Sequence, residues 1–195
     1  MRVIAGKAGG HSLAVPPSLT RPTTDRVREA LFSSLGDRVV EATVLDLYAG
    51  SGALGIEAAS RGAAEVVFVE QGDEACEVIR KNLKKTRLSG SDHPRLSVRH
   101  TRVADYLRAD TPRHRFDLVF ADPPYARDEA AQEELRALLA NPLLAAALRP
   151  DGLFVLEALD GAPLPLSESP LWTSLRDRRY GRSRLHYLSP SLADR

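Results

Sequence analysis

Hydrophobic and polar positions along this 195-residue chain fall into blocks that predict strands and helices in turn. Short apolar runs bounded by turn residues are typical of strands buried on both faces, whereas apolar residues three and four apart indicate one face of a helix. The predicted strands cover residues 43–48, 65–70, 96–100, 116–121, 153–157, 171–180 and 184–188. The predicted helices that follow the first strand cover residues 52–61, 74–87, 103–107, 129–139 and 142–148.

This alternation predicts a doubly wound α/β fold with a mostly parallel, seven-stranded sheet. Ligands of such sheets bind beyond the carboxyl ends of the strands. We assign residues 41–195 to this domain and residues 1–40 to a small extension before it. The extension is predicted to contain an irregular hairpin and then a helix, which begins at Thr23 or Thr24 and ends at Gly36.

The strand predicted over residues 116–121 runs directly into Asp122-Pro123-Pro124-Tyr125. Two prolines cannot donate to a sheet ladder, so the strand ends here and the turn is stiff. The Asp122 carboxylate and the Pro123 carbonyl can accept N–H bonds, and the ring of Tyr125 can stack on a base. We therefore predict that these four residues hold a planar base with an exocyclic amine at a catalytic site. The structural alternative is a proline turn with a capping aspartate.

A glycine-rich loop joins the first predicted strand to the helix after it. Gly50, Gly52 and Gly55 satisfy G-x-G-x-x-G, a spacing that lets the backbone turn tightly and approach a ligand closely. Glu70 ends the second strand, where a carboxylate can accept hydrogen bonds from both hydroxyls of a ribose. Taken alone, the loop also describes a dinucleotide site, so the motif does not decide the cofactor.

Asp46 favours a cationic cofactor. It is an acid inside an otherwise apolar strand, and a buried carboxylate is costly unless it is paired. S-adenosylmethionine carries an ammonium group and a sulfonium that suit such a partner, whereas a pyrophosphate would be repelled. The alternative is that Asp46 caps the loop by accepting bonds from its N–H groups.

The charge of the chain is balanced overall but segregated along the sequence. The net charge is +1, yet residues 80–102 carry eight basic side chains against Asp92. Residues 1–28 and residues 171–187 each carry five basic side chains against one acid. Such clusters permit a basic face for nucleic acid. Solvated helix and loop surfaces are the alternative for any one cluster.

The composition narrows the class further. With 43% apolar and 27% charged residues, the chain resembles an ordinary globular protein, and no apolar run approaches the ~20 residues of a membrane span. The single Cys76 cannot form an internal disulfide, and the five histidines lack the spacing of metal ligands. We expect a cytoplasmic protein with no metal and no membrane association.

Taken together, these motifs resemble the RsmD-type bacterial 16S rRNA (guanine-N2)-methyltransferase family. The resemblance covers nearly the whole chain and rests on RVIAG at residues 2–6, RPTTDRVREALF at residues 21–32, LDLYAGSGALG at residues 45–55 and DPPY at residues 122–125. The segment at residues 21–32 is the most specific of these, because many amino-methyltransferases share DPPY. Where the family often has Asn or Asp before its adenine-contacting segment, this chain has Arg102.

The resemblance implies a class I, Rossmann-like methyltransferase. It would transfer a methyl group from S-adenosyl-L-methionine to N2 of a guanine in 16S rRNA of the small ribosomal subunit or its assembly intermediate. The implied cofactor contacts are Asp46, Ala49, Gly50, Ser51, Gly52, Glu70, Gln71, Val103 and Ala104. We expect a monomer.

The resemblance also gives the N-terminal arginines a role. Arg21, Arg26 and Arg28 would grip RNA phosphates while the extension covers the cofactor. The alternative is that Arg26 and Arg28 pair with nearby acids such as Asp25 at helical spacing.

Three other functions share parts of this pattern. A DNA or RNA adenine-N6 methyltransferase would share the glycine loop and the DPPY turn, although 195 residues leave little room for a target-recognition insertion. An NAD-dependent oxidoreductase would share the glycine spacing. A non-catalytic RNA-binding assembly factor would share the basic segments.

Overall fold

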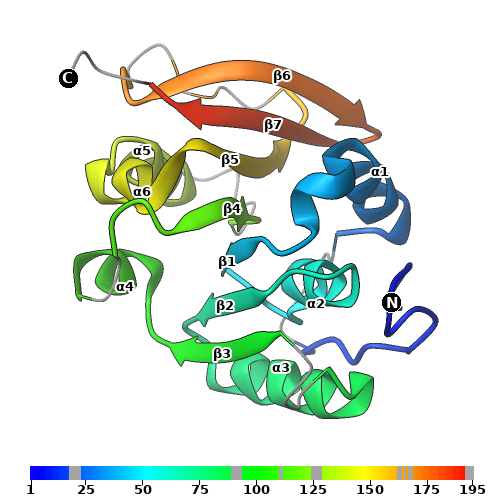
Figure 1. Ribbon diagram of the computed structural model, residues 1–195. Coiled ribbons are helices and arrows are strands. Elements are labelled where there is room, and N and C mark those ends of the chain that lie inside the picture. Colours follow the sequence, from blue (N-terminus) through cyan, green and yellow to red (C-terminus); the bar gives the residue numbers. More distant parts are fainter. Residues whose placement is uncertain are drawn as a thin grey trace. The chain divides into compact units, whose positions relative to one another are not determined.

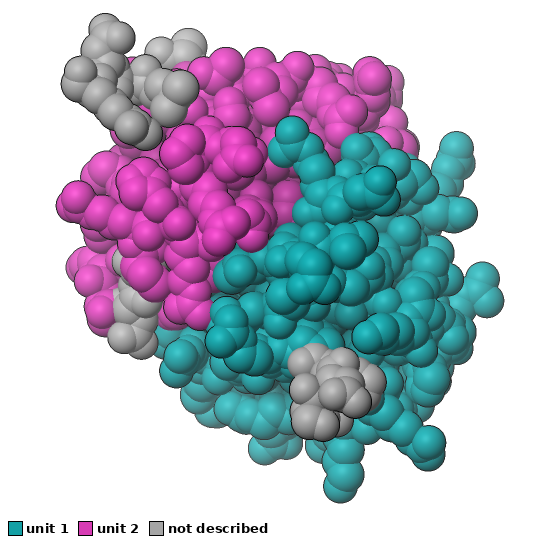
Figure 2. Space-filling view, in the orientation of Figure 1, with its two compact units in different colours: residues 1–103 teal, residues 104–195 magenta. Residues whose placement is uncertain are grey.

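The structure is a computed structural model that describes residues 1–17, 23–88, 94–109, 112–123, 129–161, 164, 166 and 169–191. Its internal contacts divide the chain into two compact units, Met1–Val103 and Ala104–Arg195 (Figure 2). The predicted boundary between an extension over residues 1–40 and a domain over residues 41–195 stays a prediction.

Helices and strands alternate through most of the chain (Figure 1). The helices are α1 (Asp25–Leu35), the short 3-10 helix η1 (Gly36–Val39), α2 (Ala53–Ser60), α3 (Asp73–Thr86), α4 (Val103–Ala109), α5 (Glu129–Leu139) and α6 (Pro142–Ala147). The strands are β1 (Thr43–Leu47), β2 (Glu65–Glu70), β3 (Arg95–His100), β4 (Phe116–Ala121), β5 (Leu148–Leu159), β6 (Trp172–Tyr180) and β7 (Ser183–Pro190).

Unit 1 contains three parallel strands in the order β3-β2-β1. Val44 of β1 is paired in register with Val66 of β2, which is paired with Leu96 of β3. The middle residues of β1 and β2 are buried as continuous runs because both faces of these strands are covered. Parallel pairing brings the carboxyl ends of the three strands to one edge, where the predicted cofactor residues begin.

Unit 2 contains β4 and β5 in parallel and the antiparallel strands β7 and β6 beyond β5. The strand order of the whole sheet is β3-β2-β1-β4-β5-β7-β6. All seven predicted strands are present, and the mostly parallel doubly wound sheet is confirmed.

The largest error in a predicted boundary concerns β5, while the other elements differ from their predicted bounds by two residues or fewer at each end. We placed the fifth strand at residues 153–157 and extended the helix before it to Leu148, whereas β5 begins at Leu148. Leu148 pairs with Phe116 of β4, and the register shifts before Leu118 pairs with Leu153. The exposed segment between these two pairs includes Pro150, which hid the start of the strand from the sequence pattern.

The N-terminal segment forms the irregular hairpin that its sequence predicts. Arg2 and Ser12 form an isolated antiparallel bridge, and Val3 N–H donates to the His11 carbonyl at 2.9 Å. Helix α1 follows, and the side chain of Thr24 accepts a bond from Val27 N–H at 3.4 Å, which confirms one of the two predicted N-caps. Among the described residues, no helix is long and apolar enough to cross a membrane.

Candidate functional site

The loop after β1 turns through a series of left-handed residues. Tyr48, Gly50 and Gly52 have φ values of 57°, 55° and 76°. Gly52 N–H donates to the Ala49 carbonyl at 2.7 Å, and α2 begins at the next residue. A glycine at position 52 therefore allows the sharp entry into α2, because residues with a Cβ atom rarely adopt that φ.

Gly55 lies in the first turn of α2, where the helix meets β2. A Cβ atom at this position would lie 2.3 Å from Cε1 of Phe68, so the helix could not pack this closely with any larger residue. The Gly55 N–H donates to Oδ2 of Asp46 at 2.9 Å. Asp46 is buried at 2% exposure, and its negative charge lies at the N-terminal end of α2, where helix dipoles favour anions.

The bond from Gly55 bears on the predicted role of Asp46. The alternative that we weighed from the sequence, an acid that caps the loop, describes this contact. A carboxylate oxygen can accept more than one hydrogen bond, so the contact also leaves room for a ligand. A cofactor contact from Asp46 stays a prediction.

Glu70 is held at the carboxyl end of β2 by two backbone groups. Its Oε2 accepts a bond from Gly50 N–H at 2.9 Å, and its Oε1 accepts one from Gly72 N–H at 2.8 Å. The carboxylate is only partly buried, and each oxygen keeps a second lone pair. Glu70 is thus fixed against the glycine loop with acceptor capacity to spare, as a ribose-binding acid requires.

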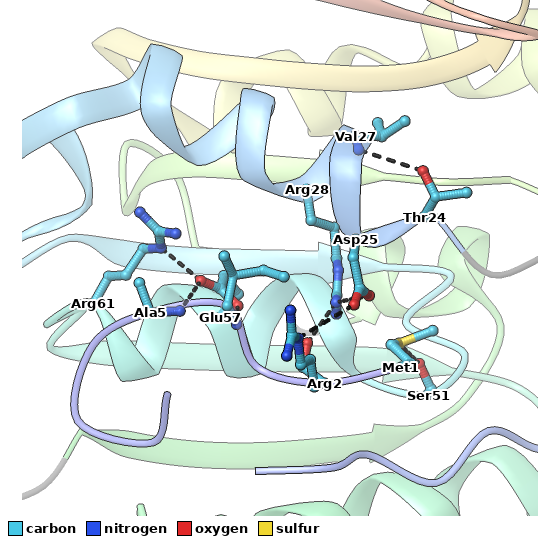
Figure 3. Close-up of polar contacts among 11 residues, drawn as sticks. Met1, Arg2, Ala5, Thr24, Asp25, Val27, Arg28, Ser51, Glu57 and Arg61 are labelled. Carbon is cyan, nitrogen blue, oxygen red and sulfur yellow. Dashed lines mark hydrogen bonds and ion pairs between the residues drawn. The ribbon is translucent and has the colours of Figure 1, made fainter. Parts of the chain in front are cut away.

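Ser51 connects the glycine loop to two distant parts of unit 1. Its Oγ donates to the sulfur of Met1 at 3.7 Å (Figure 3). Its carbonyl accepts a bond from Nδ2 of Asn82 at 2.9 Å, and the same Nδ2 donates to the Ala14 carbonyl at 3.0 Å. The buried Asn82 of α3 therefore joins the glycine loop to the N-terminal segment. Sequence reasoning missed Asn82, although a polar residue on the apolar face of α3 was a visible signal.

The hairpin is also anchored on α2 by Glu57. Oε2 of Glu57 accepts a bond from Ile4 N–H at 2.7 Å, and Oε1 accepts bonds from Ala5 N–H at 3.1 Å and from Nε of Arg61 at 2.7 Å (Figure 3). Glu57 is fully buried beneath this segment. Sequence reasoning missed this residue too, and the signal was an acid within a helix of small and apolar residues.

The remaining predicted cofactor residues lie near the ends of β2 and β3. Gln71 is exposed, and its carbonyl is in hydrogen-bonding distance of Nε2 of His100, at 3.0 Å. Val103 is buried at the start of α4, and Ala104 is exposed and belongs to unit 2. Ala49 is buried in the glycine loop itself. Cofactor contacts from these residues stay predictions.

The structure places the three predicted RNA-contacting arginines differently. Arg21 lies outside the described residues, and Arg26 is exposed on α1. Arg28 is fully buried, and its Nη2 donates to Oδ1 of Asp25 at 2.7 Å and to the Arg2 carbonyl at 2.5 Å (Figure 3). Burial lowers the pKa of the Arg28 guanidinium, and the charge of Asp25 opposes that shift. For Arg28 the alternative of a helical pair at i, i+3 describes this contact, and in this conformation the side chain is closed to an RNA phosphate.

The substrate turn is described only in its first half. Asp122 directly follows β4 and is partly buried, and its Oδ1 atom is shielded from solvent. Pro123 is buried. Pro124 and Tyr125 lie outside the described residues. Ala121, the last residue of β4, is paired with Leu156, so Asp122 stands at the carboxyl edge of the strands of unit 2.

The doubly wound sheet, the glycine loop after β1 and the acid that ends β2 define a class I, Rossmann-like methyltransferase fold. The family described as "Conserved hypothetical protein 95" matches residues 1–189. The chain belongs to this RsmD-type family.

Relatives match over nearly the whole length. The chain is 37% identical over 183 residues to the putative rRNA methyltransferase YlbH of Bacillus subtilis, covering 93% of this chain and 94% of the relative. It is 34% identical over 182 residues to ribosomal RNA small subunit methyltransferase D of Haemophilus influenzae, covering 93% of this chain and 89% of the relative. A solved structure of a hypothetical protein of Thermus thermophilus matches with a TM-score of 0.77 at 35% identity, covering 97% of this chain and 99% of the other.

Proposed function

We propose that this chain transfers a methyl group from S-adenosyl-L-methionine to the exocyclic N2 amine of a guanine in 16S rRNA. The observation that carries the proposal is the fixed Glu70 carboxylate, which Gly50 N–H holds at the carboxyl edge of β2. The relatives named as rRNA methyltransferases support rRNA as the substrate. The choice of guanine N2 rests on the sequence resemblance.

The donor and acceptor groups of unit 1 fit the proposed cofactor. Glu70 offers acceptors for ribose hydroxyls, Asp46 offers a negative charge for an ammonium, and the loop offers backbone N–H groups for a carboxylate. When bound, the cofactor supplies a methyl group on a sulfonium. The residues of the chain bind and orient it, and positioning of this kind can supply much of the rate.

Asp122 and Pro123 would act on the substrate amine. The lone pair of an exocyclic amine is delocalised into the ring, so the nitrogen is a poor nucleophile. A carboxylate oxygen of Asp122 and the Pro123 carbonyl would each accept one N–H bond, which orients the amine and raises its electron density. The nitrogen would gain a bond to the methyl carbon while the bond from that carbon to the sulfonium sulfur breaks, so that S-adenosylhomocysteine leaves with the electron pair. The surplus proton of the nitrogen would pass to Asp122 or to water. Tyr125 would stack on the base.

Tritiated methyl transfer to small ribosomal subunits from a strain that lacks the modification tests the proposal. Wild-type protein should label 16S rRNA, and Asp122→Asn should lower kcat by about 100-fold or more, within the range of general acid–base contributions. Asp37→Asn makes the same chemical change at an exposed position and should keep full activity. An unlabelled rRNA with wild-type protein, or equal activity of Asp122→Asn, would overturn the proposed mechanism.

Calorimetry separates the methyltransferase from the oxidoreductase. The protein should bind S-adenosylhomocysteine, and Glu70→Ala should weaken that binding by about tenfold or more because it removes an acceptor for a ribose hydroxyl. Binding of NAD in place of S-adenosylhomocysteine would support the oxidoreductase alternative. Binding of RNA with neither cofactor would support the non-catalytic assembly factor.

A further inference from the structure

Arginines gather at the connected ends of β6 and β7. We call residues 178–184 the arginine tip; it carries Arg178, Arg179, Arg182 and Arg184. The strands are joined by a tight turn in which Tyr180 pairs with Ser183. Strand β6 is at the end of the sheet order, so the tip stands on an edge strand of unit 2.

Strand register places the tip at the same edge of unit 2 as the substrate turn. Leu156 of β5 is paired with Ala121, the residue before Asp122, and β5 continues to Leu159, which is paired with Ser183. The tip therefore extends about 10 Å past the end of β4 at roughly 3.3 Å per residue. Three strand spacings separate β4 from β6, or about 14 Å. Roughly four stacked nucleotides span that distance, at about 3.4 Å each.

Two of the arginines hold the tip in shape. Asp160, just after β5, accepts ion pairs from Arg179 at 2.7 Å and from Arg184 at 2.9 Å. Arg184 also pairs with Asp177 of β6. Asp160 therefore holds the turn at the end of β5, and Asp177 links β6 to β7. These ion pairs fix the backbone that carries the other arginines of the tip.

The other two arginines, Arg178 and Arg182, point their charges into solvent. Both are exposed, and neither has an ion pair within the described part of the chain. Arginine binds phosphate through a planar fork of donors, so exposed guanidinium groups without acidic partners suit an RNA backbone. A different explanation is that charge on an edge strand only prevents pairing with another sheet.

We propose that Arg178 and Arg182 contact RNA phosphates a few nucleotides from the methylated base. This inference rests on the proposed function for the identity of the RNA. Phosphate contacts at the tip would set the position of the strand, while the substrate turn after β4 receives the base. The contacts would act on RNA binding and leave the chemical step unchanged.

The test measures RNA binding and methyl transfer separately. Three proteins are compared: wild type, Arg178→Ala/Arg182→Ala and Arg178→Lys/Arg182→Lys. Fluorescence anisotropy gives the Kd of each protein for 16S rRNA at several salt concentrations. Methyl transfer to small ribosomal subunits gives kcat and KM. The double alanine variant should raise Kd and the KM for RNA about tenfold, and the slope of log K against log salt should fall by about 1.4 for two single-strand contacts. Its kcat and its affinity for S-adenosylhomocysteine should equal those of wild type.

Two controls make the outcome specific. The double lysine variant keeps both charges and should keep most of the salt slope. Arg113→Ala/Arg136→Ala removes the same charge from the residues before β4 and from the last turn of α5, and should leave Kd within about twofold of wild type. Melting temperatures should agree among all variants, because surface substitutions of this kind change stability by about 0.5 kcal/mol or less.

The possible results separate this inference from the proposed function. If wild type methylates rRNA and the alanine variant matches the Arg113/Arg136 control in Kd and salt slope, the tip is not an RNA contact and the proposed function stands. If the alanine variant loses RNA binding but wild type transfers no methyl group, the contact stands and the methyltransferase proposal fails.

Discussion

Glu57→Gln tests whether a buried carboxylate fastens the N-terminal hairpin to α2. In the structure, Ile4 N–H donates to Oε2 of Glu57. Ala5 N–H and Nε of Arg61 both donate to Oε1. Glutamine has nearly the same shape but replaces one acceptor with an NH2 group. The NH2 group of the glutamine would face a backbone N–H group, so two donors would meet without an acceptor. Because the Glu57 side chain is fully buried, water could not supply that acceptor.

The size of the effect follows from these contacts. At least one hydrogen bond to a charged acceptor is lost, at about 1.5–3 kcal/mol, and the remaining bonds weaken because their acceptor becomes neutral. Arg61 also loses its ionic partner, but its side chain is 21% exposed, so this loss costs less than the ~3–5 kcal/mol of a fully buried pair. We therefore expect Glu57→Gln to lower the free energy of unfolding by about 2–4 kcal/mol. For a chain of this length the melting temperature should fall on the order of 10 °C.

Thermal unfolding and hydrogen exchange measure the two parts of this effect. The melting temperature should fall, and the Ile4 and Ala5 amides should exchange faster as the hairpin comes away. Glu134→Gln, at an exposed position on α5, should change neither quantity. Wild-type stability together with continued protection of both amides in Glu57→Gln would refute the docking role.

Three further predictions follow from the same contacts. Gly55→Ala should destabilise the protein by about 1–3 kcal/mol or more in urea unfolding, since its Cβ atom would lie 2.3 Å from Phe68, and unchanged stability would argue against the close packing of α2 on β2. Asn82→Ala should weaken S-adenosylhomocysteine binding in calorimetry, because the bonds to the Ser51 and Ala14 carbonyls are both lost; an affinity equal to that of wild type would show that Asn82 does not position the loop. Burial lowers the pKa of His186, so the unfolded chain binds its proton more readily, and the stabilisation present above about pH 6.5 should be lost as pH falls through the lower pKa of the folded state. His186→Gln should flatten the dependence of stability on pH between about 5 and 7, and an unchanged profile would assign that dependence to other groups.

The exact bounds of strands that are buried on both faces could be predicted from the sequence. Strands β2 and β4 have the bounds that were predicted, because most of their residues are apolar and buried between covered faces. Strand β5 was predicted too short, since exposed Pro150 and its polar neighbours resemble a loop while the backbone stays extended. The pattern of apolar residues indicates which segments are buried. It does not reveal an exposed segment that is extended only because it pairs with a neighbouring strand.

The candidate site shows a similar division. The glycine loop and Glu70 could be found because their spacing is local and their conformations are demanding. Glu57 and Asn82 could not be assigned a role, because the N-terminal residues that they hold lie more than 50 residues away in the sequence. For Arg28, the residue type allowed either an RNA contact or a pair with Asp25, and only the packing of α1 distinguishes the two.

Identifying the modified nucleoside tests the central proposal most directly. Small ribosomal subunits that lack the modification are incubated with the protein and isotopically labelled S-adenosyl-L-methionine, and the digested 16S rRNA is analysed by mass spectrometry. The proposal predicts label in N2-methylguanosine at a single position, with none after incubation with Asp122→Asn. Label in N6-methyladenosine, or no labelled nucleoside at all, would contradict it.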